Sequence, residues 1–229
     1  MNFVAIAESL PTYWQGLLTT LQLLALALAF GSLAALPLGV MRASSRRWLM
    51  APVWCYTGLV RGTPLLVQLF LVYYGLAQFD AVRDSPLWPW LSDARLCAVL
   101  AFGLNTCAYT TEMIAGAIRA TPHGEVEAAR AFGMPWAMRM RRIVLPSALR
   151  RCLPAYSNEV IMMLHGTSLA STVTLLDLTG AAREMNSRFY LPFEAFVTAA
   201  VFYLALTFVL VALFRCAEAR WLAYLQPRR

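Results

Sequence analysis

Long stretches without charge dominate the pattern of hydrophobic and polar positions. A helix crosses the apolar core of a bilayer with roughly 20 residues, and five segments supply such a length. The five predicted spans are residues 14–41, 56–79, 96–118, 152–176 and 193–214. The first part of the second segment, up to Arg61, is also compatible with a position along the membrane interface. The pattern therefore predicts an all-α, polytopic membrane protein.

The predicted domain organisation is simple, because no repeat or low-complexity tract divides the chain. Residues 1–13 form a short segment without a basic region, so the first span is expected to remain in the mature protein. Residues 14–216 form one membrane domain, and residues 217–229 form a tail.

The composition supports this environment and excludes several kinds of chemistry. Hydrophobic residues make up 60% of the chain and charged residues 14%, against about a quarter charged in soluble domains. All basic residues are arginine, because the sequence has no lysine. A Walker A phosphate loop needs a lysine, so we expect this chain to bind no cofactor and any ATP or Mg²⁺ to be held by a separate ATPase. The two histidines, His123 and His165, are too far apart for a convincing metal site.

The arginines predict the topology, since cytoplasmic loops of membrane proteins are enriched in Lys and Arg. Three connections are rich in arginine: residues 42–47, residues 119–151 and the tail after residue 214. The other two connections balance their arginines with acidic residues. The alternation predicts an N-terminus outside the cell and a cytoplasmic C-terminus. The arginines lie in short clusters between apolar runs, which does not indicate a nucleic-acid partner.

The connection from Ala117 to Pro154 carries the most informative pattern. Thr121 followed by Pro122 predicts a helix start with Pro at the first helical position. Gly133 is expected to end this helix in the left-handed conformation, and an Arg-rich helical segment follows it. From spacing alone, an amphipathic helix on the membrane surface is an equally good interpretation.

Four motifs in this order resemble the type I ABC importer permeases of the polar amino acid family. The first is the EAA loop, which consists of Glu127, Ala128, Ala129, Gly133, Ile143, Leu145 and Pro146. The other three are Arg61–Phe70, Asn105–Glu112 and Leu153–Val160. The resemblance covers nearly the whole chain, and the histidine and lysine/arginine/ornithine importers are the most similar group.

The resemblance implies a function and a set of partners. Such a chain is the membrane subunit of an ATP-driven importer of polar or basic amino acids in the bacterial inner membrane, and it is not itself an enzyme. Its partners are a second permease subunit, identical or related, two cytoplasmic ATPases and a periplasmic binding protein. The EAA helix, between the third and fourth spans, docks on the ATPase through Glu127, Ala128, Ala129, Gly133, Leu145 and Pro146. Alternatively, Glu127 pairs with a neighbouring arginine.

Ionisable and polar residues at membrane depth are costly and are often functional. Arg61, Tyr109, Glu112 and Glu159 are therefore candidates for the substrate pathway, although a structural bridge between helices is an alternative for Arg61, Glu112 and Glu159. In the fourth span the polar residues Asn158, His165, Ser168 and Thr172 fall on one helical face, which is expected to face a bundle or cavity. Gly166 is expected to loosen this helix or to permit close packing.

Other functions were weighed against transport by an importer. An intramembrane enzyme would need a catalytic motif such as HExxH or GxSxG, and the sequence has neither. An ATP-independent channel or scaffold leaves the EAA loop unexplained. Other small polar solutes, such as opines or glutamine, remain alternatives to basic amino acids.

Overall fold

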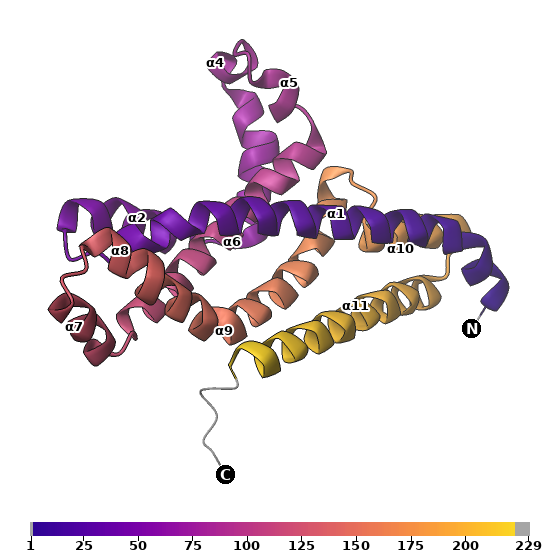
Figure 1. Cartoon of the computed structure of the whole chain (residues 1–229). Helices are drawn as coiled ribbons and strands as arrows, with labels where there is room; N and C mark the ends of the chain where they lie inside the picture. Colours follow the sequence, from indigo (N-terminus) through magenta and orange to yellow (C-terminus); the bar gives the residue numbers. More distant parts are fainter. Residues whose placement is uncertain (1, 223–229) are drawn as a thin grey trace.

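The computed structural model describes residues 2–222, and within that range the chain is helical without any strand (Figure 1). The α-helices are α1 Phe3–Arg42, α2 Arg47–Arg61, α3 Leu65–Phe70, α4 Asp80–Arg83, α5 Trp88–Leu91, α6 Ala94–Arg119, α7 His123–Ala131, α8 Trp136–Arg139, α9 Leu145–Gly166, α10 Leu178–Phe189 and α11 Pro192–Trp221. Two π-helical turns, η1 Leu71–Gly75 and η3 Met140–Val144, and two 3₁₀ segments, η2 Leu76–Gln78 and η4 Thr167–Val173, connect them. The end of the predicted tail, including Arg228 and Arg229, lies outside the described residues.

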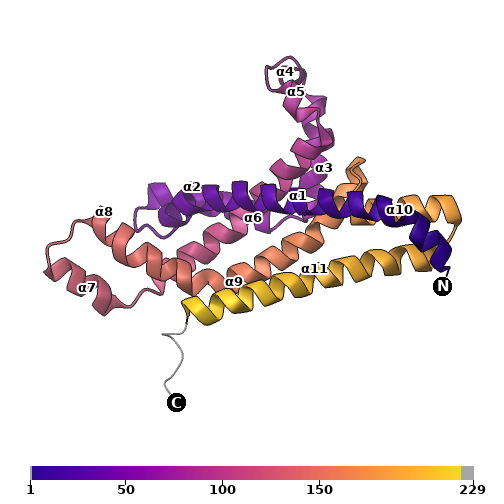
Figure 2. The same ribbon diagram turned by 45° about the vertical axis from the view of Figure 1, so that its right-hand side comes forward.

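The long helices α1, α6, α9 and α11 lie together, and the segment from α3 to α5 projects away from them in both views (Figures 1 and 2). The helix α1 begins at Phe3, well before the first predicted span, because the side chain of Asn2 caps it by accepting a hydrogen bond from the Ala5 amide. The helix α11 likewise extends beyond the predicted span, to Trp221. Both helices are thus longer than the spans predicted within them.

The helix α1 packs closely on α6 through a stripe of small residues. Ala27, Gly31, Ala35 and Gly39 recur every four residues and are buried. A Cβ atom on Gly31 would lie 2.7 Å from the carbonyl oxygen of Gly103 in α6. Such small residues let the backbones of membrane helices approach closely.

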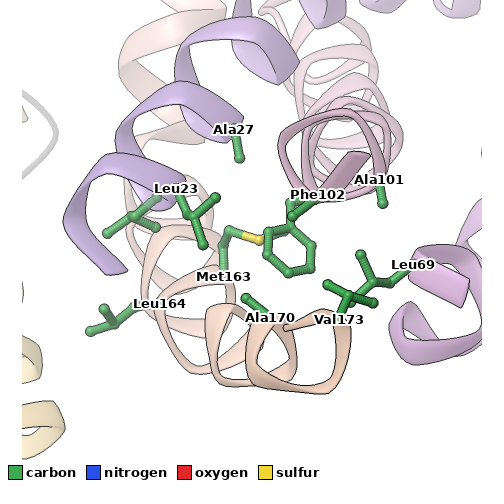
Figure 3. Packing of buried hydrophobic residues seen from close by; sticks show 11 residues of the cluster. Leu23, Ala27, Leu69, Ala101, Phe102, Met163, Leu164, Ala170 and Val173 are labelled. Atoms are coloured by element: carbon green, nitrogen blue, oxygen red, sulfur yellow. The ribbon is translucent and has the colours of Figure 1, made fainter. Parts of the chain in front are cut away.

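A hydrophobic cluster fills the space where four segments meet (Figure 3). Phe102 of α6 lies between Met163 of α9 and Val173 of η4, while Leu23 of α1 and Leu69 of α3 lie on either side (Figure 3). All five side chains are buried. This cluster joins α3 to the long helices, so it fixes the direction in which α3 leaves them.

The predicted second span is not one straight helix. The axes of Arg47–Arg61 and Leu65–Gln78 differ by 103°, and the chain breaks between them at residues 62–64. The chain bends here because Pro64 cannot continue an α-helix from the preceding turn and disfavours helical geometry at Thr63. The span over residues 56–79 therefore contains a bend, and its place in the membrane stays a prediction.

The helix that contains the predicted fourth span begins well before it, because α8, η3, α9 and η4 follow one another without a break from Trp136 to Val173. Pro146 does not end the helix. In a regular α-helix its missing N–H would leave a carbonyl of the preceding turn unpaired, but the π-helical turn η3 directly before it changes the backbone there. The α-helix changes to 3₁₀ geometry after Gly166, as expected for a glycine that loosens it. A Cβ on Gly166 would also lie 2.9 Å from Leu65.

Length and apolar composition support two membrane-spanning helices among the described residues, α1 and α11. Two bent pairs raise the number to four if each is one span: Arg47–Arg61 with Leu65–Gln78, and Trp136–Val173 with Leu178–Phe189. The helix α6 is 26 residues long, about 39 Å, but polar residues fill its second half. The predicted number of five spans therefore stays a prediction.

The helix α10 lies in a connection that the apolar pattern left without structure. The side chain of Asp177 begins it by accepting hydrogen bonds from the amides of Thr179 and Gly180. Tyr203 of α11 donates a third hydrogen bond to this carboxylate over 3.1 Å. The amide of Leu178 donates to Thr20 of α1. These contacts hold α10 against both neighbouring helices.

Candidate functional site

A cavity of about 610 Å³ opens beside the break between α2 and α3. The lining comes from three parts of the chain: the end of α2 and the start of α3, the middle of α6, and the middle of α9. Arg61, Tyr109, Asn158 and Glu159, four of the residues predicted for a substrate pathway, line it together with Asn105. The structure thus brings these four predicted residues to one place.

The side chain of Gln68 holds the broken backbone at the edge of this cavity. Its amide nitrogen donates to the carbonyl oxygens of Val60 and Thr63 over 2.6 and 3.0 Å, groups that the break leaves without helical partners. Its amide oxygen accepts a hydrogen bond from Asn105 over 3.0 Å. Irregular backbone is tolerated at membrane depth where it lines a cavity and its polar groups are satisfied, and Gln68 meets that requirement.

The cavity is lined by one basic and one acidic side chain, Arg61 and Glu159, which form no salt bridge with each other. The guanidinium carbon of Arg61 lies 5.1 Å from the centroid of the Tyr109 ring, a cation–π contact. Glu159 is buried, with 6% of its surface exposed, and it takes part in none of the salt bridges within residues 2–222. Two unpaired opposite charges on one cavity suit a ligand that carries both signs.

Glu112, although predicted for the same pathway, is outside the lining of this cavity. One of its carboxylate oxygens accepts hydrogen bonds from Nε of Arg42 and from the hydroxyl of Thr57, each over 2.6 Å. The expected bridge from Glu112 to Arg61 is not formed; Arg42 at the end of α1 takes that place. The arrangement ties α1, α2 and α6 to one another.

The predicted polar face of the fourth span is divided between different surroundings. His165 and Ser168 line a second cavity of about 430 Å³ against Tyr203 and Thr207 of α11. A ring nitrogen of His165 lies 3.2 Å from the Thr207 hydroxyl. Thr172 lines neither cavity, and its hydroxyl donates to the Leu169 carbonyl within the same turn. Asn158 and His165 both lie on the α-helix α9 and line different cavities because they are about two turns apart along it. Ser168 and Thr172 follow the change to 3₁₀ geometry, where the 100° spacing no longer holds.

Glu127, Ala128 and Ala129 of the EAA loop lie on α7. This helix begins at His123, one residue later than predicted, because Pro122 precedes it as the N-cap. Gly133 has φ +71°, as predicted, and the helix ends in a Schellman arrangement: the amides of Gly133 and Met134 donate to the carbonyls of Arg130 and Ala129. Glu127 and Ala128 are exposed and Ala129 is buried. Leu145 and Pro146 lie further along, within the continuous helix.

The carboxylate of Glu127 remains available, because it forms no salt bridge with any described residue. Phe132 beside the turn is 85% exposed. In both views α7 and the turn after it form one end of the molecule (Figures 1 and 2). An exposed aromatic ring and an unpaired carboxylate at the tip of a hairpin are suited to contact another protein.

Residues 27–222 match the family of binding-protein-dependent transport system inner membrane components. This chain belongs to that family. It is 48% identical to the histidine/lysine/arginine/ornithine transport system permease protein HisM of Escherichia coli K12, over 96% of this chain and 98% of HisM. It is 45% identical to the octopine transport system permease protein OccM of Rhizobium radiobacter, over 96% of this chain and 87% of OccM.

The fold of the permease is also similar to that of a solved transporter. A chain in the crystal structure of an amino acid ABC transporter with histidines superposes with a TM-score of 0.85 at 34% identity, covering 96% of this permease and 99% of that chain. The family and the fold establish the permease as a membrane subunit of an ABC importer, and the resemblance noted in the sequence is confirmed.

Sequence reasoning missed the roles of three side chains of the permease, those of Asn105, Gln68 and Arg42. Asn105 and Gln68 lie inside motifs that were noted as wholes, and their polarity within apolar runs was the available signal. Arg42 was assigned to topology alone, since nothing local marks it as the partner of Glu112. Among residues 2–222 no group of three His, Cys, Asp or Glu side chains is placed to hold a metal ion.

Proposed function

We propose that this chain is the permease subunit of an ATP-driven importer that carries polar and basic amino acids across the bacterial inner membrane, and that the 610 Å³ cavity receives the amino acid. The observation that carries the proposal is the pair of separated charges, Arg61 and Glu159, on one cavity. A free amino acid is a zwitterion, so its carboxylate suits the guanidinium and its cationic groups suit the carboxylate.

The chemistry of the cavity favours basic substrates over neutral ones. With the substrate carboxylate at Arg61, Glu159 is available for an ammonium, guanidinium or imidazolium group, and the amides of Asn105 and Asn158 supply neutral hydrogen bonds. Tyr109 and the cavity's methionines provide surface for an aliphatic stem. The HisM protein, 48% identical, is a transporter of histidine, lysine, arginine and ornithine by its name, which supports the same class here.

An opine is the second candidate substrate, because OccM, 45% identical, is by its name an octopine permease. An opine adds a second carboxylate to the amino acid. The cavity lining holds one guanidinium, that of Arg61, and a second carboxylate would lie near Glu159. This charge balance favours the amino acid.

We further infer five spans, with α6 as the third. Its polar residues face α1, α2 and α9 rather than lipid, so its lower apolar content does not prevent it from crossing. The N-terminus is then outside, and the arginine-rich connections and the C-terminus are cytoplasmic, in agreement with the positive-inside pattern.

On this topology α7 is the coupling helix. Glu127, unpaired in the described part of the chain, would meet a donor on a separate ATPase, and closure of the ATPase pair would move the hairpin as a rigid unit. A second permease subunit and a periplasmic binding protein complete the assembly. The permease itself needs no bound cofactor, since ATP and Mg²⁺ belong to the ATPase.

Reconstitution tests this proposal. The permease is placed in vesicles with its partner permease, the ATPase and the binding protein encoded nearest to it, and uptake of labelled arginine, lysine, histidine, glutamine and octopine is measured. We expect ATP-dependent uptake of the basic amino acids first. Uptake that is unaffected by omitting ATP would indicate a channel, and preference for octopine would move the substrate class to opines.

A further inference from the structure

A third cavity, of about 320 Å³, lies between the ends of the long helices and the α7 hairpin. Its lining includes three arginines from three different helices: Arg119 at the end of α6, Arg130 of α7 and Arg139 of α8, with His123 beside them. No acidic residue belongs to the lining. The three arginines line a hollow rather than a convex surface. This distinguishes the cavity from an ordinary charged surface that is exposed to solvent.

None of these arginines is neutralised within residues 2–222. The salt bridges of the described residues include none of the three. Arg119 donates to the carbonyl of Arg42 over 2.7 Å, and Arg139 to the carbonyl of Met134 over 3.4 Å, so each keeps further N–H groups for another acceptor. The guanidinium group has geometry suited to paired contacts with phosphate oxygens.

A fourth guanidinium, that of Arg151, contacts a residue of the lining without lining the cavity itself. Arg151 of α9 donates to the hydroxyl of Thr121, a lining residue, over 2.9 Å. Its Nε atom is buried and has no hydrogen-bond partner in the structure. An anion in the cavity would be stabilised by this charge as well, because the low polarity around a buried group screens it less than water does.

The position of the cavity selects the source of the anion. Its lining includes Ala43, the residue directly after α1, and Ile118, the last residue but one of α6, so it lies at the ends of both helices. That level corresponds to the headgroup region if the long helices cross the bilayer. Trp136, 60% exposed at the start of α8, also lines the cavity, and tryptophan is enriched at the membrane interface. The exposed turn at Gly133 lies beyond the cavity, at the end of the hairpin.

We propose that this cavity binds the phosphate of an anionic phospholipid headgroup, and that the bound lipid helps to hold α7 against α6 and α8. The proposal rests on the membrane topology given under the proposed function, but not on the transported substrate. Basic pockets between membrane helices are known to bind anionic headgroups. A lipid phosphate here would bridge Arg119, Arg130 and Arg139, whose positive charges otherwise repel one another where α6, α7 and α8 meet.

Native mass spectrometry of the purified full-length permease tests the proposal. The protein is titrated with phosphatidylglycerol and, separately, with zwitterionic phosphatidylcholine, and the affinity of the first bound lipid is measured. The triple variant Arg119→Gln, Arg130→Gln and Arg139→Gln should lose about tenfold or more in affinity for phosphatidylglycerol. The single variant Arg130→Gln, on an exposed face of α7, should show part of this loss and covers the case in which the triple variant does not fold.

A matched control removes two arginines of the same segment that do not line the cavity. Arg141→Gln with Arg142→Gln should change the affinity less than about twofold, because surface charge alone contributes at both sites. An equal loss in this control would overturn the proposal, and so would equal affinity for the two lipids. Failure of amino acid uptake would not affect these measurements, so the two proposals can fail separately.

Two further arms identify other occupants. Inorganic phosphate at millimolar concentration should leave the bound phosphatidylglycerol in place; displacement would assign the cavity to free phosphate instead. Addition of the ATPase to the lipid-bound permease should also leave the lipid in place. Release of the lipid on assembly would mean that an acidic side chain of the ATPase occupies the cavity, and would overturn the lipid assignment.

Discussion

Arg42, the last residue of α1, donates a hydrogen bond from Nε to Oε1 of Glu112 over 2.6 Å, and this ion pair joins the end of one long helix to the middle of another. The side chains are 14% and 18% exposed. Thr57 of α2 donates to the same oxygen. Three helices thus meet at one carboxylate, at the same end of the molecule as the α7 hairpin.

Glu112→Gln should destabilise the protein, because it leaves the guanidinium of Arg42 mostly buried without its counter-charge. We expect a loss of about 2 kcal/mol in the free energy of unfolding. Thr57→Val removes one hydrogen bond and should cost less, about 0.6 kcal/mol. Unfolding of the detergent-solubilised protein by sodium dodecyl sulfate measures both. Arg83→Gln, which removes an exposed pair with Asp80, serves as the control and should be neutral.

Glu159→Gln should lower the uptake of arginine and lysine while sparing glutamine. Loss of a charge-assisted hydrogen bond is worth about 2 kcal/mol, which corresponds to roughly thirtyfold in apparent affinity. Uptake by reconstituted vesicles at graded substrate concentrations measures it. Glu184→Gln, on the exposed face of α10, is the matched control. An equal reduction for glutamine would show that Glu159 supports the fold rather than the cation.

Gly133→Val should uncouple transport from ATP hydrolysis by distorting the turn after α7. Gly133 has φ +71° with open space where a Cβ would lie, so the cost is conformational, about 1–2 kcal/mol. Gly133→Asn should be better tolerated, since Asn adopts this conformation more readily. Gly124→Ala, also in open space but helical, should leave coupling intact. The ratio of substrate imported to ATP hydrolysed is the readout.

Gly31→Ala should loosen the packing of α1 on α6. The added methyl group would lie 2.7 Å from the carbonyl oxygen of Gly103 and 2.9 Å from the Thr106 side chain, and overpacking of this kind costs about 1–3 kcal/mol. Gly116→Ala has no atom within 4 Å of the new carbon and should be neutral or slightly stabilising. Thermal unfolding in detergent compares them. Equal midpoints for the two variants would contradict the packing described for α1.

The elements that face lipid could be predicted, while those whose form depends on tertiary contacts could not. The runs that became α1 and α11 are apolar throughout, so length alone identified them. The break at residues 62–64 lies inside an apolar run, and the backbone carbonyls it frees accept hydrogen bonds from Gln68, whose side-chain oxygen accepts in turn from Asn105. Helical periodicity carries no information about such a partner.

The candidate site was likewise predictable only in part. Arg61, Tyr109, Asn158 and Glu159 were identified because polar residues at membrane depth are costly, and they do share one cavity. Glu112 was noted for the same reason, yet its partner Arg42 is 70 positions away in the chain. Pairing between distant charges depends on how helices pack, and a single sequence does not specify that. The left-handed conformation at Gly133, by contrast, depends on local geometry and was predicted.

The uninterrupted helix from Trp136 to Val173 makes the hairpin and the cavity parts of one lever. Trp136 and Glu159 stand 23 residues apart on it, about 35 Å along the axis. In the proposed coupling, a tilt applied at the hairpin would move Glu159 along with it, while Arg61 belongs to the separate helix α2. Such a tilt would change the spacing between the two charges, so we propose that release of the cargo follows from leverage rather than from any chemical change in the side chains that hold it.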